Sequence, residues 1–377
     1  MRQVEKILGE CLDCGICLQE CLYLEKVGKS PIELANGFKE GTLSNKPKIA
    51  YSCFLCDLCA SLCPQELNIG AMCMEVRETM VEDRTGPLKS HGFMKKDQEF
   101  VNSESFLLTQ FNPQYSHAAT IPESCAYFPG CALSGYSPQL VIDSYEYLKS
   151  VLRCSAIILH CCGAPSLFIG RRAEFEMTMA HIVEQVKKVG AGKLVMACPD
   201  CYHTTKRFMK NYDSSLEVTT IYHIMASRGL PALLPEVENS VITVHDSCKA
   251  RNDAELQNAV RDVIRKLGHT IDEMSCSREK TRCCGNGGMV PYVDQQLYKG
   301  QAETILAATT NNISTYCAGC RETLAAVGGS VAHVLDLVFN PNWRNAVSEK
   351  ANTGKKKREN QALLKKLLEE KMGVSSC

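Results

Sequence analysis

The sequence lacks net charge, because 42 lysine and arginine residues balance 42 aspartate and glutamate residues along 377 positions. A chain without a global field is not drawn to nucleic acid or to an anionic membrane surface. No apolar run reaches the length of about eighteen residues needed to span a bilayer, and the opening MRQVEKILGE carries no apolar signal segment. We therefore expect a cytoplasmic protein without a nucleic-acid partner, held at a membrane only through a partner subunit.

Nucleotide-binding fingerprints are also missing. The stretch GAGK at residues 190–193 lacks the spacing of a phosphate loop, and no glycine-rich dinucleotide motif is present. A flavin or nicotinamide would therefore sit on another subunit. With 45% hydrophobic and 22% charged residues, the chain is an ordinary globular protein with room for two or three domains.

Cysteine is abundant, with 23 residues. In a long chain without a secretory segment, clustered cysteines indicate reduced thiols that bind metal. CLDCGICLQEC and CFLCDLCASLCP are two copies of the run C-x2-C-x2-C-x3-C, in which three cysteines hold one 4Fe-4S cubane and the fourth reaches the other cubane. This rule assigns Cys11, Cys14, Cys17 and Cys63 to one cubane, and Cys53, Cys56, Cys59 and Cys21 to a second. Structural zinc is the alternative, but zinc closes with four ligands from two short pairs and has no use for interleaved groups of four.

The two runs define a predicted ferredoxin-like domain at residues 1–85. Between them, SPIELANGF predicts a helix with Ser30 as its cap and Pro31 in its first turn. Cys73 lies in the helical stretch AMCMEVRETM, where we expect it to pack rather than to bind metal. Residues 86–124 are polar and turn-rich, which predicts a linker that wraps the next domain.

A second cysteine pattern occurs twice: a single cysteine, then Cys-Cys-Gly, then Cys-x-x-Cys. The first copy has Cys131, Cys161, Cys162, Cys198 and Cys201, and the second has Cys248, Cys283, Cys284, Cys317 and Cys320. Short β-like runs end where these cysteines begin, namely CAYFPGC, SAIILHCC, KLVMACPDC, VITVHDSC, TIDEMSC and ISTYCAGC. Helical patterns lie between them, at residues 137–152, 174–190, 253–268 and 298–309. We therefore predict two α/β domains, residues 125–235 and 236–340, each with a parallel sheet and one cofactor site at the carboxyl ends of its strands.

Four further cysteines stand outside the sets above. Cys125 also precedes Cys161 at a suitable distance, so the first ligand of the first copy is Cys131 or Cys125; we prefer Cys131 because it directly follows a strand, as Cys248 does. Cys154, Cys276 and Cys377 match no motif, and we expect them to be packing or surface residues.

The phrases FPGC, HCCG, CPDC, HDSC, RCCGNGG and CAGC resemble the CCG-domain iron-sulfur family, whose type member is the catalytic subunit of heterodisulfide reductase. Two 4Fe-4S motifs followed by two CCG domains are similar to the fused form of that subunit, and also to the iron-sulfur subunits of glycolate oxidase and anaerobic glycerol-3-phosphate dehydrogenase. The resemblance implies an all-helical ferredoxin-like domain followed by two pseudo-repeated α/β CCG domains. It also implies that each set of five cysteines binds a noncubane 4Fe-4S cluster and does the catalytic work. Zinc or an ordinary cubane in one of these sites is the alternative.

Two functions are consistent with the resemblance. In the first, the chain passes electrons from the cubanes to the two noncubane clusters, which cleave a small disulfide substrate. In the second, it is an electron relay between a flavoprotein dehydrogenase of a 2-hydroxy acid or glycerol 3-phosphate and a quinone or cytochrome. Either function needs a flavoprotein or membrane-cytochrome partner subunit. The completeness of both five-cysteine sets favours the reductase.

Residues beside the ligands have two interpretations each. Backbone N–H groups at Gly163, Gly285, Gly287 and Gly288 can bond sulfur or simply form turns, while His160, His203, His245 and Asp246 can supply protons or be hydrogen-bonded at strand ends. Arg282 and Arg321 can bind an acidic substrate in a cavity shared by Cys198–Cys201 and Cys317–Cys320, or bond a cluster sulfur or a carbonyl. Residues 341–377 predict a basic linker and an amphipathic helix at ALLKKLLEEKMG, which is either exposed to solvent or docks on a partner.

Overall fold

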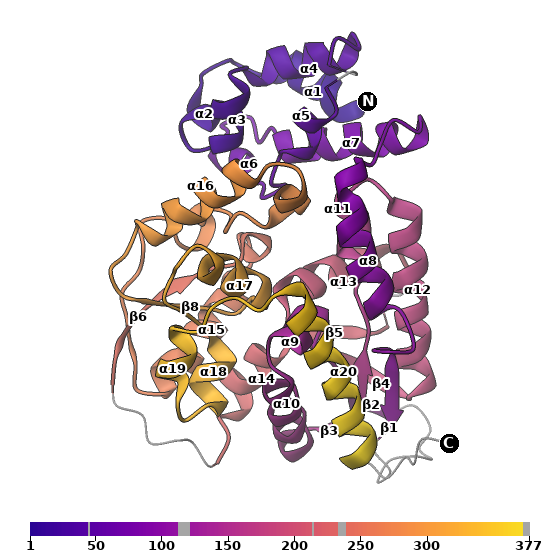
Figure 1. The fold of residues 1–377 in the computed structure, drawn as a ribbon, viewed down its shortest axis with the longest axis vertical. Helices are drawn as coiled ribbons and strands as arrows, with labels where there is room; N and C mark the ends of the chain where they lie inside the picture. The colour runs from indigo at the N-terminus through magenta and orange to yellow at the C-terminus, as the bar shows by residue number, and fades with distance from the viewer. Residues whose placement is uncertain (44–45, 112–120, 213–214, 233–238, 372–377) are drawn as a thin grey trace.

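The computed structural model describes residues 1–43, 46–111, 121–212, 215–232 and 239–371. A helical N-terminal part sits at one end of the molecule, above two α/β parts that lie beside each other (Figure 1). This architecture confirms the predicted fold class, an all-helical domain followed by two repeated α/β units.

Short helices around two cysteine-bearing loops form the N-terminal part. They are α1 (Arg2–Glu10), α2 (Ile16–Gln19), α3 (Leu22–Val27), α4 (Pro31–Lys39), α5 (Lys48–Tyr51), α6 (Leu58–Leu62) and α7 (Ile69–Glu82). The predicted start of α4 is present as a capping box: Glu33 N–H donates to the Ser30 hydroxyl at 3.3 Å, and Ser30 N–H donates to the Glu33 carboxylate at 2.7 Å.

The segment expected to be an irregular linker contains regular structure. It forms the helix α8 (Gly92–Val101) and the strand β1 (Leu108–Phe111), which pairs antiparallel with β3 at the edge of the first sheet. Neither element could be predicted from the sequence. The helix α8 buries only Met94 and Val101, and an edge strand of four residues is too short to show alternation of apolar and polar side chains. Residues 112–120 lie outside the described part of the chain.

The first sheet has the strand order β1-β3-β2-β4-β5, and every pair except β1 with β3 is parallel. Its strands are β2 (Ile121–Phe128), β3 (Arg153–Leu159), β4 (Ala191–Met196) and β5 (Glu217–Thr220). The helices around it are α9 (Cys131–Tyr136), α10 (Pro138–Val151), α11 (Ala164–Phe168), α12 (Arg172–Lys188), α13 (Pro199–Tyr212) and α14 (Ile221–Arg228).

The second sheet repeats this order without the extra strand, as β7-β6-β8-β9, and is parallel throughout. Its strands are β6 (Val241–His245), β7 (Thr270–Ile271), β8 (Asn312–Thr315) and β9 (Val331–His333), and its helices are α15 (Ala254–Lys266), α16 (Gln295–Leu306), α17 (Ala318–Ala326) and α18 (Val334–Phe339). The strand expected in TIDEMSC ends after two residues. There Asp272 accepts a hydrogen bond from Asn311 and Glu273 pairs with Arg261, so both side chains leave the pattern of a strand.

The C-terminal segment packs on its own chain. After α19 (Trp343–Val347), the helix α20 (Gly354–Lys371) runs along α9 and α10 (Figure 1). It buries Leu364 and Leu368, and the Asn360 amide donates to the carbonyl oxygens of Gly135 and Tyr136 at 2.9 and 3.2 Å. The helix α20 is therefore neither isolated in solvent nor a free docking element. Residues 372–377, with Cys377, lie outside the described residues.

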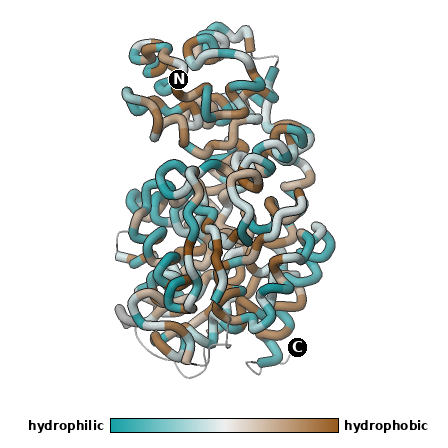
Figure 2. Tube along the Cα trace, turned by 90° about the vertical axis from the view of Figure 1, so that its left-hand side faces the viewer, coloured by the Kyte–Doolittle hydropathy of each residue, from teal (hydrophilic) through white to brown (hydrophobic). Residues whose placement is uncertain are grey.

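Hydrophobic segments alternate with hydrophilic ones along the chain, and no long uniform apolar segment is seen (Figure 2). Within the described residues, no helix combines the length and the apolar composition that crossing a bilayer requires.

A fully buried ion pair lies beneath the carboxyl end of β6. Both side chains of Arg261 and Asp246 are inaccessible to solvent, and the guanidinium donates two hydrogen bonds to the carboxylate at 2.8 and 2.9 Å. The same carboxylate accepts from the Tyr316 hydroxyl at 3.1 Å and from Arg278 N–H at 2.8 Å. Asp246, one of the proposed proton donors, is therefore occupied by structural contacts.

Changing Asp246 to asparagine should lower the free energy of unfolding by about 3 kcal/mol, because the buried guanidinium of Arg261 then loses the fully buried one of its two carboxylate partners. Urea unfolding followed by far-UV circular dichroism measures the change. Asp262→Asn is the matched control, since its pair with Arg265 is 4.0 Å long and both side chains are more than half exposed. The control should change stability by less than about 0.5 kcal/mol. Equal effects of both variants would contradict the prediction.

Candidate metal centres

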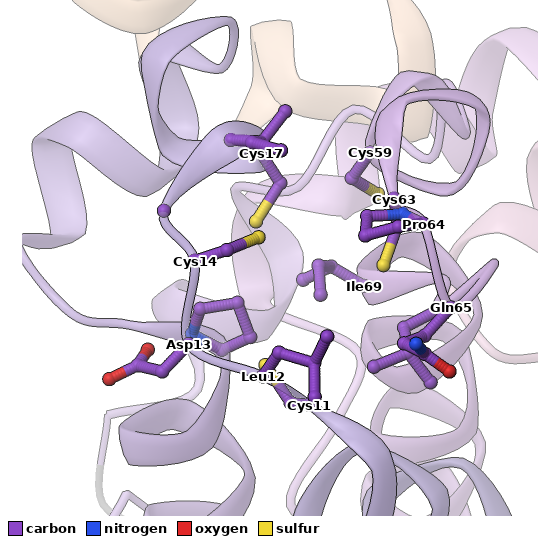
Figure 3. Close-up of a pocket in the computed structure, with 14 residues that line it drawn as sticks. Cys11, Leu12, Asp13, Cys14, Cys17, Cys59, Cys63, Pro64, Gln65 and Ile69 are labelled. Carbon is purple, nitrogen blue, oxygen red and sulfur yellow. The ribbon is translucent and has the colours of Figure 1, made fainter.

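The first group of thiols lies between the two N-terminal loops. Cys11, Cys14, Cys17 and Cys63 line one pocket, into which the sulfurs of Cys14, Cys17 and Cys63 point (Figure 3). Burial, followed by the nearby Cys11, raises the pKa of the Cys17 thiol to about 11. A bound metal removes such protons, because cysteine coordinates as the thiolate. Cys14 is exposed, so this group reaches the surface.

A second pocket beside the first brings together Cys21, Cys53, Cys56 and Cys59. Burial, then the neighbouring Cys56 and Cys53, raises the pKa of the Cys21 thiol to about 12. In both pockets, the fourth cysteine of one run therefore lies with the first three of the other run.

The two loops share an unusual backbone. In each Cys-x-x-Cys-x-x-Cys segment the third and fifth residues are left-handed: Asp13 and Gly15 have φ of 49° and 74°, and Leu55 and Asp57 have φ of 51° and 59°. This conformation is costly for leucine and aspartate. It is repeated at matching positions, as expected where each loop must curl around a bound group.

The first five-cysteine set converges at the carboxyl ends of β2, β3 and β4. The thiol of Cys161 lies beside those of Cys131 and Cys162, Cys162 lies beside Cys201, and Cys201 lies beside Cys198. Gly163 N–H donates to the Cys161 sulfur at 3.4 Å.

Cys125 lies elsewhere, inside β2, where it is paired in register with Cys154 on the neighbouring strand. The structure thus places Cys131, and not Cys125, with the first set.

The second five-cysteine set has the same chain of contacts, from Cys248 through Cys283, Cys284 and Cys320 to Cys317. The N–H groups of Gly285 and Gly287 donate to the Cys283 sulfur at 3.3 and 3.4 Å. Gly288 has a different role from these two glycines. Its φ is +58°, and an added Cβ would lie 2.2 Å from the Cys53 carbonyl oxygen, so this glycine permits close approach of the helical domain.

The two sets meet each other. The Cys198 thiol lies beside Cys201 and beside Cys317 of the other set, and its interaction with these two thiols lowers its pKa. One tyrosine joins the strand ends behind them: the Tyr222 hydroxyl contacts the carbonyl oxygens of Ala197 and Tyr316 at 3.3 and 3.2 Å. The carboxyl ends of β4 and β8 therefore face each other.

The helical domain meets the second set through its thiols. Cys56 lies close enough to Cys248 and Cys283 for their charges to interact, and Cys283 also lines the pocket of the second cysteine group. The four groups of thiols consequently follow one another in space: the Cys11 group, the Cys21 group, the second five-cysteine set, then the first.

Three cations that the sequence did not single out hold this junction. Arg77 donates to the Cys53 carbonyl at 2.7 Å, Lys249 to that of Leu55 at 2.6 Å, and Arg251 to that of Cys56 at 3.2 Å. Arg77 is fully buried. The sequence signal that could have identified Arg77 is a basic residue on the apolar face of a predicted helix.

The histidines expected near the ligands have different surroundings. His160 Nδ1 lies 2.8 Å from the Cys161 carbonyl oxygen, and His203 Nε2 lies 3.5 Å from the Asp253 carboxylate. His245 reaches two thiols: one of its ring nitrogens and the sulfurs of Cys284 and Cys320 all lie within 4.8 Å of one another.

The two arginines proposed to bind substrate do not share a cavity. Arg321 is fully buried and donates to the carbonyl oxygens of Val331, Ala346 and Glu349. One residue along α17 from Cys320 is about 100° around the helix. Arg321 therefore points in a different direction from the thiol, and its carbonyl contacts match the second of its two interpretations. Arg282 pairs with Glu20 beside the second cysteine group.

The donor set fits iron-sulfur groups. Eight thiols line two adjoining pockets between curled loops, with Cys17 and Cys59 at the boundary of both. Ten further thiols form two sets of five, in which three backbone N–H groups donate to sulfur. Iron-sulfur clusters are held by cysteine thiolates, and hydrogen bonds to their sulfurs tune the reduction potential.

Comparison with known proteins agrees with this chemistry. Residues 10–68 match a 4Fe-4S dicluster domain, and residues 125–206 and 242–325 match the CCG cysteine-rich domain. An uncharacterized iron-sulfur protein of Methanocaldococcus jannaschii is 24% identical, over 84% of this chain and 67% of that protein. A fumarate reductase (CoM/CoB) subunit from Methanothermobacter marburgensis is 25% identical, over 85% and 68%. A subunit of the dihydromethanophenazine:CoB–CoM heterodisulfide reductase from Methanosarcina barkeri is 24% identical, over 73% and 72%.

The domain matches and the names of these relatives confirm the resemblance seen in the cysteine motifs. The chain therefore contains a 4Fe-4S dicluster domain followed by two CCG cysteine-rich domains, and its relatives support the role of an iron-sulfur oxidoreductase subunit.

Proposed function

We propose that this chain is the disulfide-cleaving subunit of a heterodisulfide reductase-like complex. The Cys11 and Cys21 groups would each hold a 4Fe-4S cubane, and the two sets of five cysteines would each hold a noncubane 4Fe-4S cluster. The observation that carries the proposal is the contact between Cys198 and Cys317, because it brings two complete five-thiol sets to one place. The name of the Methanosarcina barkeri relative supports a disulfide substrate.

The spatial order of the groups suits a path for electrons. The exposed Cys14 marks the end at which a flavoprotein or cytochrome subunit would exchange electrons with the chain. The two five-cysteine sets, of whose ten cysteines eight are buried, mark the other end. Between them, the Cys21 group lies against both the Cys11 group and the second set.

Reductive cleavage of a disulfide takes two electrons and two protons and releases two thiols. When bound, the iron-sulfur groups supply electrons one at a time. The residues of this chain hold those groups, exclude bulk water around Cys198 and Cys317, and keep the ends of β4 and β8 together through Tyr222.

An electron relay between a flavoprotein dehydrogenase and a quinone or cytochrome is the second candidate. The linear order of the thiol groups serves a relay equally well. A relay, however, gives no reason for two five-thiol sets to meet at their sulfurs, so the reductase explains more of the geometry.

Anaerobically purified protein should contain about sixteen irons per chain, four in each of four sites. Colorimetric iron and acid-labile sulfide assays measure this. About eight irons together with stoichiometric zinc would remove both noncubane clusters from the proposal.

Loss of one ligand should affect one site. Cys162→Ser should abolish the EPR signal of one five-cysteine site and leave both cubane signals, because that set is built from the first α/β domain and not from the helical one. Cys63→Ser should instead remove the cubane of Cys11, Cys14 and Cys17. Cys276→Ser is the control and should change no signal, since Cys276 belongs to none of the four groups. Loss of cubane signals in Cys162→Ser would contradict the assignment of ligands.

The reductase and the relay differ in one assay. Iron-replete protein reduced with titanium(III) citrate should convert a small organic disulfide into two thiols, measured by thiol release. Cys317→Ser should abolish this turnover while both cubane signals persist. Wild-type protein that carries all four clusters but releases no thiol from any of a panel of acidic and neutral disulfides would favour the relay.

A further inference from the structure

The two five-cysteine sets differ in the side chains on which they rest. Three positions before the first cysteine of each set, β2 ends in Phe128 and β6 ends in His245. Each residue has a partner in the adjacent parallel strand: Phe128 pairs with Met196, and His245 pairs with Thr315. Met196 and Thr315 also occupy matching positions, two before Cys198 and Cys317. The same place in the fold is apolar in the first copy and polar in the second.

The polar pair in the second copy is buried and unsatisfied. His245 and Thr315 have no solvent-accessible surface, and within the described part of the chain neither ring nitrogen of His245 nor the Thr315 hydroxyl has a hydrogen-bond partner. The adjacent Asp246 is not their hydrogen-bond partner, because its carboxylate already accepts from Arg261, Arg278 and Tyr316. An unpaired buried polar group destabilises the folded protein, so His245 and Thr315 require a hydrogen-bond partner that the described residues do not provide.

The direction of His245 identifies that partner. A ring nitrogen lies within 4.8 Å of the sulfurs of both Cys284 and Cys320, which are two of the five thiols of the second set. Thr315 lies on the same face of the sheet beside His245, because residues in register on adjacent strands point the same way. The imidazole therefore faces the group that the second set would hold.

The first set has no imidazole at the position that corresponds to His245. It has the same five thiols in the same chain of contacts, with Phe128 where the second has His245. An imidazole N–H next to thiolates and sulfide is a hydrogen-bond donor, and donors to the sulfurs of a cluster stabilise its reduced, more negative state.

We propose that His245, supported by Thr315, donates a hydrogen bond to sulfur at the second five-cysteine site and gives the iron-sulfur group there a higher reduction potential than the group at the first site. The inference rests on the proposed function, which puts such a group at each set. The second set is also the one that meets the helical domain, so the site with the higher potential is the one nearest the cubanes.

The test compares variants that exchange the two environments. In a Cys162→Ser background, which leaves the second site as the only five-cysteine signal, His245→Phe copies the first site. Redox titration followed by EPR should show that this signal moves to lower potential, while both cubane potentials and the remaining iron content are unchanged. Thr315→Val should cause a smaller shift in the same direction, and it serves as the second variant if His245→Phe does not fold. His245→Gln, which retains an N–H donor, should keep most of the wild-type potential.

Pulsed EPR gives an independent measurement. The second-site signal should show a weakly coupled nitrogen that is lost in His245→Phe. Unchanged potentials in iron-replete variants would overturn the proposal, and so would a strongly coupled nitrogen, which would make His245 an iron ligand. Iron analysis of the wild type separates these results from failure of the proposed function: a second site without iron would overturn that function and this inference together.

Discussion

The buried guanidinium of Arg77 holds the three parts of the molecule in place. It donates to the carbonyl oxygens of Ala50 and Cys53 in the helical domain, of Phe168 in the first α/β domain and of Gly288 in the second. A buried charge is costly unless all of its donors are used, and here four carbonyl oxygens from three domains are needed to use them. The relative placement of the domains, and with it the spacing between thiol groups, therefore depends on this contact.

Charge around the thiol groups is unevenly distributed. Arg77, Lys249 and Arg251 all donate to the Cys53–Cys56 loop. The residues from 7 to 25, which carry the exposed Cys14, include four acidic side chains and no lysine or arginine. Cations beside a cluster favour its reduced state and acidic groups disfavour it. The loop of the first cysteine run is thus rich in acidic residues, whereas the loop of the second run is contacted by three cations.

The duplication shows which features of a cofactor site a fold preserves. Strand order, the chain of thiol contacts and the N–H bond from the glycine after the cysteine pair recur in both α/β domains. The residues under the thiols do not, since Phe128 and Met196 in one copy correspond to His245 and Thr315 in the other. Topology brings the ligands together, whereas the neighbouring side chains can diverge and make the two sites chemically distinct.

The sequence by itself determined the local features of this protein. Cysteine spacing predicted groups that the structure brings together, including the exchange of Cys21 and Cys63 between runs, because a few residues of chain set the reach of each thiol. Helices with periodic apolar residues and clear caps, such as α4, α10 and α15, were also predictable. Only the tertiary structure decided the order of the thiol groups in space, the packing of α20 on α9, and the structural role of Arg321. These depend on buried hydrogen bonds between residues more than 25 positions apart, as from Arg77 to Gly288 or from Arg321 to Glu349, and such contacts leave no periodic signal in the chain.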